Sequence, residues 1–70
     1  MTNYSAHEKK SLPNWVKWIA QDKDGKWWGF SDEPHEHHAG WYENEVGRYI
    51  FIKQDIENED WQKSLLKISV

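Results

Sequence analysis

Six tryptophans in a chain of 70 residues without cysteine are the feature that most constrains the fold. A chain this short buries only about 60% of its unfolded surface, and without cysteine neither disulfides nor thiolate zinc sites can add stability. Each large aromatic side chain can bury roughly 150–250 Å². The sequence therefore predicts a single small domain with an aromatic core.

Charge and hydropathy limit the classes of partner. Nine Lys and Arg stand against twelve Asp and Glu, for a net charge of −3, so the strong positive field of a phosphate-binding protein is missing and nucleic acid is a disfavoured partner. No apolar run approaches the roughly 20 residues of a membrane span. The start of the chain, residues 1–11, has no apolar signal-peptide centre. With zero cysteines, this pattern favours a cytoplasmic protein without a membrane partner.

A β-hairpin is the firmest structural prediction. Residues 15–21 alternate so that Val16, Trp18 and Ala20 form an apolar face, as in a half-buried strand, although a helix remains an alternative for so short a run. Asp22-Lys23-Asp24-Gly25 then provides a turn, with Gly25 able to adopt a positive φ. A second strand is expected over residues 26–31.

The middle of the chain is predicted as a loop followed by extended structure. Residues 32–40 contain Pro34, Gly40 and three histidines, which is typical of an exposed loop. Extended structure resumes at Trp41 and Tyr42. Residues 48–53 are rich in β-branched and aromatic types and predict another strand. The continuous apolar run 49–52 indicates contacts on both faces, so this strand should be central or covered by a helix.

The end of the chain predicts a helix. Asn58 is a candidate cap, acidic residues follow it, and Trp61, Leu65 and Ile68 fall on one helical stripe that can pack on a sheet. The expected fold is therefore α+β, with a small antiparallel sheet of three or four strands and one C-terminal helix packed on it. The domain should occupy residues 12–70 and follow a flexible arm, residues 1–11.

Catalytic and metal chemistry find little support in the residues. The Asp22–Gly25 segment lacks the ligand spacing of a calcium loop. His35, His37 and His38 are weak candidates for zinc or nickel, because they lie on one stretch and favour adventitious surface binding over a built site. No motif identifies a nucleophile, a phosphate loop or a dinucleotide turn. We therefore expect neither enzymatic activity nor a cofactor.

Binding to another protein is the function that the aromatic residues favour. Adjacent Trp27 and Trp28 must point to opposite faces of a regular strand, so one of them can join an exposed aromatic patch. The predicted binding residues are Trp27, Trp28, Trp41 and Tyr42. The partner is expected to be a protein, and a homodimer formed through the same patch is possible. The competing interpretation is that most of the tryptophans serve only as core.

The same residues carry a resemblance. The pattern W-x-x-W-x-A-x-D-x-D-G-x-W, together with a later tryptophan followed by Ser-Leu, resembles short proteins of tailed phages and prophages that have no established activity. The matching positions are Pro13–Ala20, Asp22–Trp27, Phe30, Pro34, Trp61, Ser64 and Leu65. The resemblance implies an accessory protein of the bacterial host cytoplasm that occupies a host or phage protein. A virion or assembly component is one alternative, and a metal-dependent or nucleic-acid-processing accessory factor is another.

Overall fold

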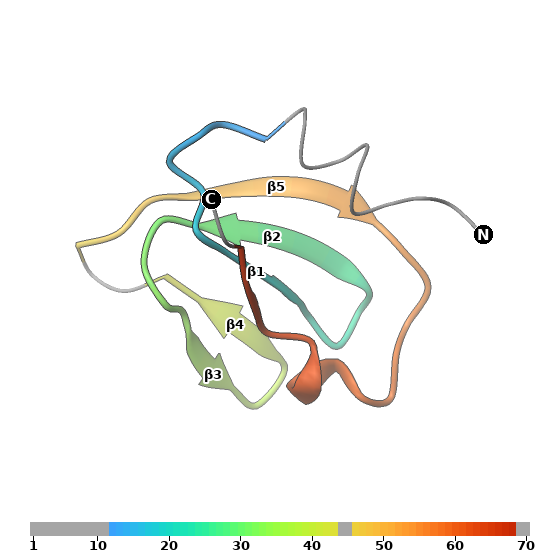
Figure 1. Ribbon diagram of the computed structural model, residues 1–70. Coiled ribbons are helices and arrows are strands. Elements are labelled where there is room, and N and C mark those ends of the chain that lie inside the picture. Colours follow the sequence, from blue (N-terminus) through green and yellow to red (C-terminus); the bar gives the residue numbers. More distant parts are fainter. Residues whose placement is uncertain (1–11, 44–45, 69–70) are drawn as a thin grey trace.

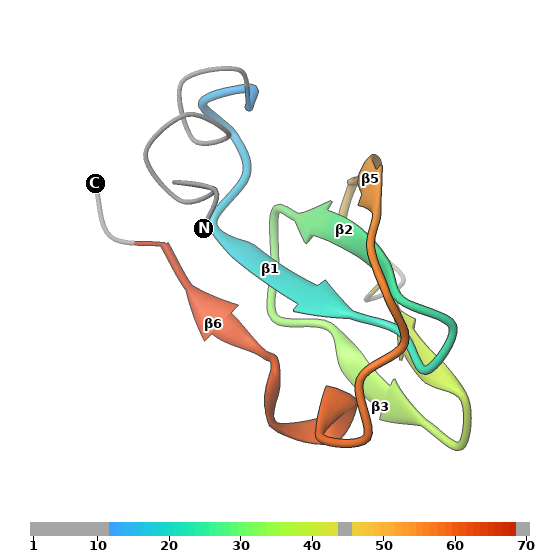
Figure 2. The ribbon, with the colours of Figure 1, turned by 90° about the vertical axis from the view of Figure 1, so that its right-hand side faces the viewer.

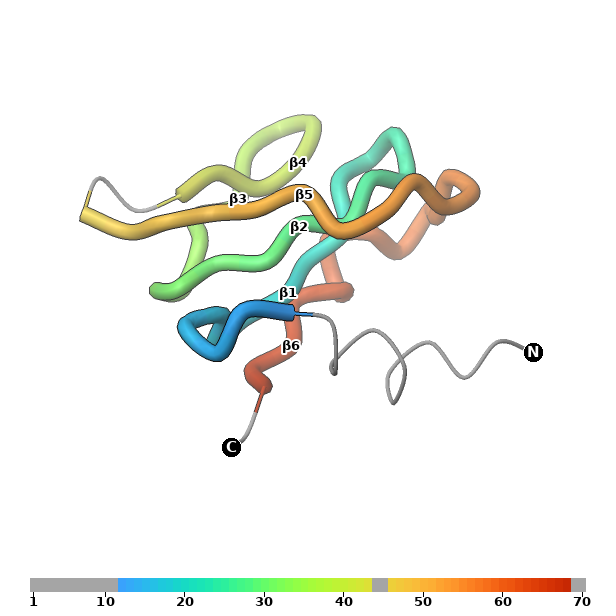
Figure 3. The backbone as a smooth tube through the Cα atoms, turned by 90° about the horizontal axis from the view of Figure 1, so that it is seen from above, coloured from blue at the N-terminus to red at the C-terminus, as the bar shows by residue number. Residues whose placement is uncertain are grey.

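The described part of the protein contains a four-stranded antiparallel sheet and a separate two-stranded hairpin (Figure 1). The computed structural model describes residues 12–43 and 46–68, so the arm predicted at residues 1–11 lies outside the described residues. The strands of the larger sheet lie in the order β5-β2-β1-β6, which Figure 3 shows in succession. The elements are β1 (Trp18–Gln21), β2 (Lys26–Phe30), β3 (His35–His37), β4 (Gly40–Tyr42), β5 (Tyr49–Gln54), the 3-10 turn η1 (Trp61–Lys63) and β6 (Leu66–Lys67).

The predicted hairpin between β1 and β2 is confirmed. Ala20 pairs with Trp28 and Gln21 pairs with Trp27 in a regular antiparallel register. The turn closes with Gly25 N donating to Asp22 O at 2.9 Å, and Gly25 has a φ of 96°. Glycine reaches this left-handed region without the steric penalty of a Cβ. The local Asp-Gly signal therefore determines this part of the fold.

Two rows of side chains cross one face of the larger sheet. Trp18, Phe30 and Tyr49 form the first row, because each pairs with the next across β1, β2 and β5. The second row is Ala20, Trp28 and Phe51. Residues directly opposite each other share a face, as do residues two apart in a strand. This face is consequently aromatic from its centre to the β5 edge.

The opposite face of the sheet is aliphatic. Ile19, Gly29 and Ile50 form its central row, and Val16 lies over Gly29, where an added Cβ would come within 2.9 Å of Val16 Cγ1. Of the predicted inward set, Val16 and Ala20 are both buried but lie on opposite faces of the sheet, and Trp18 is only half-buried. Ile19, expected on the outer face, is buried as well. Both faces of β1 are covered, so alternation alone misassigned its sides.

The strand at residues 49–54 is an edge strand, contrary to prediction. β5 pairs with β2 on one side and stands at the end of the strand order. Its pairing contains a register shift between Trp27 and Trp28, which are opposite Lys53 and Phe51, so that Ile52 is an extra residue. Tyr49 and Phe51 remain about half exposed. The apolar run therefore reflects an exposed aromatic face in addition to a packed aliphatic one.

The predicted loop at residues 32–40 is also corrected, because it contains β3 and the start of β4. His35 pairs with Tyr42 and His37 with Gly40. The resulting hairpin attaches to the β1–β2 turn, where Lys23 N donates to Ala39 O at 3.1 Å. The histidine-rich sequence gives no clear strand signal, whereas the structure holds this hairpin by pairing with the adjacent β4 and by contact with the β1–β2 turn.

Within residues 12–43 and 46–68 no C-terminal helix packs on the sheet, so the predicted α+β class is wrong. Described residues 58–68 form only the three-residue η1 and the short strand β6. Ser64 Oγ accepts a hydrogen bond from Gln21 N at 2.7 Å, and Leu66 pairs with Ile19 in β1. These long-range contacts hold the chain extended beside β1, as Figure 2 shows. About ten residues cannot sustain a helix by themselves, so strand pairing prevails.

The burial of Trp61, which the helix prediction included, is observed, although no α-helix forms there. Trp61 is buried, with 6% of its surface exposed, and its ring meets that of Trp41 edge-on at 6.4 Å. The segment leading to it is anchored by Gln21, whose Nε2 donates to Gly25 O and Ile56 O at 3.2 and 3.1 Å. Trp61 is therefore a core residue, although a 3-10 turn holds it in place.

Candidate protein-binding surface

The two adjacent tryptophans of β2 lie in different surroundings. Successive strand residues point to opposite faces, and both indoles are half-buried. Trp27 Nε1 donates to Asp55 Oδ2 at 3.4 Å, a long contact at the start of the segment that follows β5. Trp28 instead packs against the aromatic side chains of β5. Of this pair, Trp28 joins an aromatic cluster and Trp27 does not belong to it.

Trp28, Tyr49 and Phe51 form what we call the aromatic surface. The Trp28 ring lies 5.4 Å from that of Phe51 in an edge-on arrangement and 5.8 Å from that of Tyr49 in a tilted one. Both separations fall within the favourable range for aromatic pairs. Tyr49 is 54% exposed and Phe51 is 47% exposed. The three rings thus brace one another while two of them remain accessible.

The two binding residues predicted on β4 also separate. Trp41 turns inward, where its ring contacts Trp61. Tyr42 points outward and is 48% exposed, with the rings of His35 and His37 at 5.4 and 5.6 Å. The main role of Trp41 is therefore structural. Tyr42, in contrast, belongs to an exposed group with His35 and His37 on the β3–β4 hairpin.

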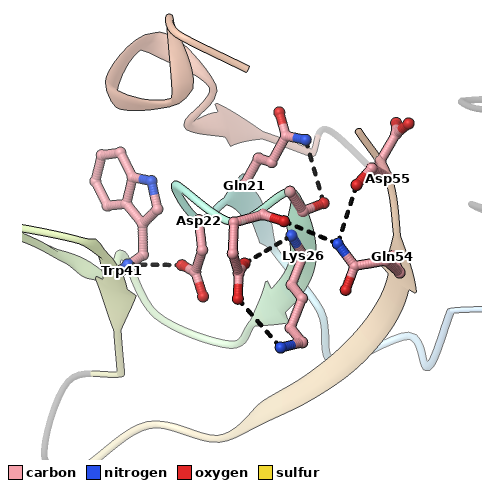
Figure 4. Close-up of polar contacts among 8 residues, drawn as sticks. Gln21, Asp22, Lys26, Trp41, Gln54 and Asp55 are labelled. Atoms are coloured by element: carbon pink, nitrogen blue, oxygen red, sulfur yellow. Dashed lines mark hydrogen bonds and ion pairs between the residues drawn. The ribbon is translucent and has the colours of Figure 1, made fainter. Parts of the chain in front are cut away.

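An open pocket lies where this hairpin meets the β1–β2 turn, and we call it the hairpin pocket. Its volume is about 470 Å³, and its lining residues are Asp22, His37, Ala39, Gly40, Trp41 and Tyr42. Asp22 Oδ1 accepts a hydrogen bond from Trp41 N at 2.8 Å (Figure 4). A Cβ at Gly40 would come within 2.5 Å of the same oxygen, so any larger residue there would displace the Asp22 carboxylate. The pocket thus combines aromatic walls with one carboxylate.

The Asp22 carboxylate is partly withdrawn from water. Burial is the main cause that raises the pKa of Asp22 above the usual 3.8, and the negative charge of Asp24 raises it further. Three groups lower this pKa without cancelling the rise, namely the Trp41 backbone N–H, the Trp28 indole N–H and the charge of Lys26. Trp28 Nε1 nevertheless lies outside hydrogen-bond geometry with any described acceptor. Trp28 therefore links the two features: its ring belongs to the aromatic surface, and its N–H faces the carboxylate of the hairpin pocket.

Asp24, in the same turn, has the opposite environment. It is exposed, and its Oδ2 forms an ion pair with Lys26 Nζ at 3.1 Å. Hydrogen bonding from the Lys26 backbone is the main cause that lowers the pKa of Asp24. Gln54 ties this turn to β5 by donating from Nε2 to Asp24 O at 2.9 Å (Figure 4). The Asp22–Gly25 segment therefore acts as a hairpin turn, the role that its sequence predicts.

The histidines predicted as weak metal candidates occupy β3 and the turn after it. Within residues 12–43 and 46–68, no three His, Cys, Asp or Glu side chains come together in a group able to hold a metal ion. The imidazoles of His37 and His38 lie 4.3 Å apart between ring centroids. The neighbouring carboxylate, Glu36, accepts a hydrogen bond from Gln62 Nε2 at 2.7 Å. The observed contacts of this segment are thus aromatic and structural.

Three residues of the site were missed in the sequence. The sequence predicts Tyr49 and Phe51 in a strand that is central or covered by a helix, and it predicts Asp22 only in a turn. A signal for the first two was present, since Trp28 and Phe30 on one strand and Tyr49 and Phe51 on another are each two residues apart. Such i, i+2 aromatic pairs on neighbouring strands can form facing rows. Nothing local indicated that Asp22 would meet β4.

Comparisons with protein-family models, curated proteins and solved structures find no match to this chain. In the described part of the chain, no helix has the length and apolar character needed to cross a membrane. The geometry of the aromatic surface and of the hairpin pocket is therefore the basis for a functional proposal.

Proposed function

We propose that this domain is a non-enzymatic binding protein whose aromatic surface docks on a protein partner. The observation that carries the proposal is the clustering of Trp28, Tyr49 and Phe51, with two of the rings about half exposed at a sheet edge. Trp and Tyr dominate the energetics of protein interfaces. Their rings bury much area and lose few rotatable bonds when they become ordered.

Preorganisation supports the same proposal. The Trp28 ring contacts both exposed rings, so they are held in place before any partner arrives. Ordering a side chain on binding costs about 0.5–1.5 kcal/mol, and a braced ring avoids part of this cost. Steric occupation of the partner is the mechanism that such a surface provides. The sequence resemblance supports, as part of this proposal, a phage-infected or lysogenic bacterial cytoplasm as the setting and a host or phage protein as the partner.

A site-specific photo-crosslinker tests the proposal in bacterial cells. Benzoylphenylalanine replaces Phe51 in one variant and Leu66 in the other. Leu66 is a matched control, because it is also an exposed apolar residue but lies in β6 at the other edge of the sheet. We expect a discrete adduct from position 51 and none from position 66. An adduct with the mass of two chains would identify a second copy as the partner.

The opposite outcome is equally clear. Equal adducts from both positions would indicate indiscriminate contact, and the absence of an adduct from position 51 would contradict docking at this surface. Once the partner is known, the double variant Tyr49→Ser/Phe51→Ser should weaken binding by about 30-fold or more, which corresponds to the 2 kcal/mol expected of hot-spot residues. Leu66→Ser should leave the affinity within about twofold.

A further inference from the structure

The hairpin pocket holds a carboxylate that forms no direct ion pair within the described part of the chain. Among the described residues, the observed ion pair of this turn joins Lys26 to Asp24 and leaves Asp22 out. Asp22 Oδ1 accepts a hydrogen bond from Trp41 N, and among the described residues no hydrogen bond to Oδ2 is observed. A partly buried carboxylate without a cationic partner is unfavourable. A ligand that supplies the missing charge would therefore gain energy on entering the pocket.

The walls of the pocket restrict the kind of cation that fits. Tyr42 and His37 present rings that meet edge-on, with an interplanar angle of 89° and centroids 5.6 Å apart. Both side chains are exposed on the side of the hairpin where the pocket opens. A flat, weakly hydrated guanidinium stacks on an aromatic face and donates hydrogen bonds to a carboxylate at the same time. Arginine meets both requirements better than the compact, strongly hydrated ammonium of lysine.

The position of the pocket connects it to the aromatic surface. Trp28 contacts Tyr49 and Phe51 through its ring, and its indole N–H faces Asp22. A chain segment lying on the aromatic surface can therefore place a neighbouring long side chain in the pocket. The net charge of −3 also favours a basic segment as the occupant.

We propose that the hairpin pocket binds the guanidinium of an arginine in the partner, with Asp22 as its counter-ion and Tyr42 as its stacking wall. This inference rests on the proposed function for the identity of the protein partner, and it specifies that partner as a segment carrying arginine beside apolar residues. The chemistry of the pocket is testable without the partner.

The test is an NMR titration of the ¹⁵N-labelled full chain with N-acetyl-arginine methylamide. Each of the six tryptophans has one indole N–H, whose NMR signal reports on its surroundings. We expect saturable shifts of the Trp41 backbone amide and of the Trp28 indole, with no shift of the Trp27 indole. The citrulline analogue has nearly the same shape but no charge, and it should produce no saturable shift. Equal shifts with citrulline, or no saturation with arginine, would overturn the proposal.

Two carboxylate variants sharpen the titration. Asp22→Asn keeps an oxygen that can accept the Trp41 N–H and removes the charge, so binding of the arginine probe should weaken at least tenfold. Asp24→Asn is the matched control, because Asp24 lies in the same turn but is exposed and paired with Lys26, and it should change the affinity less than twofold. If Asp22→Asn binds like the parent, Asp22 is not the counter-ion.

A third variant protects the test against misfolding. Tyr42→Ala removes an exposed wall of the pocket, and binding should weaken several-fold while the spectrum stays dispersed. Unchanged binding in Tyr42→Ala would also contradict the proposal. The two proposals fail separately: arginine binding without a crosslink at position 51 would disprove docking at the aromatic surface and leave the pocket standing. A crosslink at position 51 without arginine binding would disprove the arginine site in the pocket and leave docking at the aromatic surface standing.

Discussion

Phe30 and Tyr49 are direct neighbours on one face of the sheet, yet Phe30 is buried and Tyr49 is exposed. They pair across β2 and β5, and Phe30 is 2% exposed while Tyr49 is 54% exposed. The difference is their place in the strand order, since β2 is flanked on both sides and β5 stands at the edge. Residue type makes both of them look like core. Position in the sheet decides which aromatic stabilises the fold and which remains available for binding.

The largest effect should come from the buried member of this pair. Phe30→Ala should destabilise the domain by about 3–5 kcal/mol, the usual cost of deleting a buried aromatic, whereas Tyr49→Ala should cost less than about 1 kcal/mol. Chemical denaturation of both variants gives the two values. Similar losses in both variants would show that the edge of the sheet is as firmly packed as its centre.

A second contrast lies within the segment after β5, in which Ile56 is 80% exposed and Trp61 is buried. Trp61→Ala should cost about 3–5 kcal/mol, which approaches the entire stability of a small domain. Ile56→Ala should change the stability by less than about 0.5 kcal/mol. Thermal melting of the two variants provides the measurement, and a Trp61→Ala melting temperature within a few degrees of the parent would refute the core role.

The turn before β2 should show an intermediate effect. Gly25→Ala places a Cβ at a φ of 96° and against the carbonyl oxygen of Asp55. A strained φ of this kind costs about 1–3 kcal/mol, and the contact with Asp55 adds to this cost. Lys23→Ala, in the same turn but exposed, is the control and should be nearly neutral. A neutral Gly25→Ala would mean that the turn adopts another conformation.

The two aspartates of this turn should differ in the sign of their pH dependence. The raised pKa of Asp22 means that its ionised form opposes folding, so its unfavourable contribution grows as pH rises from 3.8 through the folded-state value. Asp22→Asn should therefore gain most over the parent near neutral pH and lose that advantage in acid. The lowered pKa of Asp24 favours folding above 3.8, and that contribution disappears as pH falls through its folded-state value.

Urea denaturation between pH 3 and pH 7 measures this contrast. Asp24→Asn should be slightly less stable than the parent at neutral pH and equal to it in acid. Both aspartates are partly or largely exposed, so the effects should be the smallest among the stability measurements. A parallel pH dependence in the two variants would contradict the different environments assigned to them.

Local signals predicted the local structure of this chain and failed where distant contacts decide. The hairpin at Gly25 was predictable, because turn chemistry is encoded in neighbouring residues. The stripe of Trp61, Leu65 and Ile68 indicated a helix, but Ser64 and Leu66 are held by β1 instead. The histidine-rich strand β3 was missed for another reason: its partner β4 is close in sequence, but His35–His37 lack the β-branched and aromatic types that indicate a strand.

The same distinction applies to the candidate site. Trp28 and Tyr42 could be proposed from the sequence, since adjacent aromatics in a strand must separate to opposite faces. Tyr49 and Phe51 could be assigned only after the strand order was known, because the apolar run 49–52 fits a central strand equally well. Asp22 joins the site through β4, which lies about twenty residues further along the chain.

The account depends most directly on whether the aromatic surface binds without being needed for folding. Unfolding free energy and affinity for the crosslinked partner should be measured together for the parent, Tyr49→Ser/Phe51→Ser and Leu66→Ser. We predict that the double variant keeps its stability within about 1 kcal/mol of the parent and loses about 30-fold or more in affinity, while Leu66→Ser keeps both. A double variant that unfolds, or that folds and binds like the parent, would contradict the central claim.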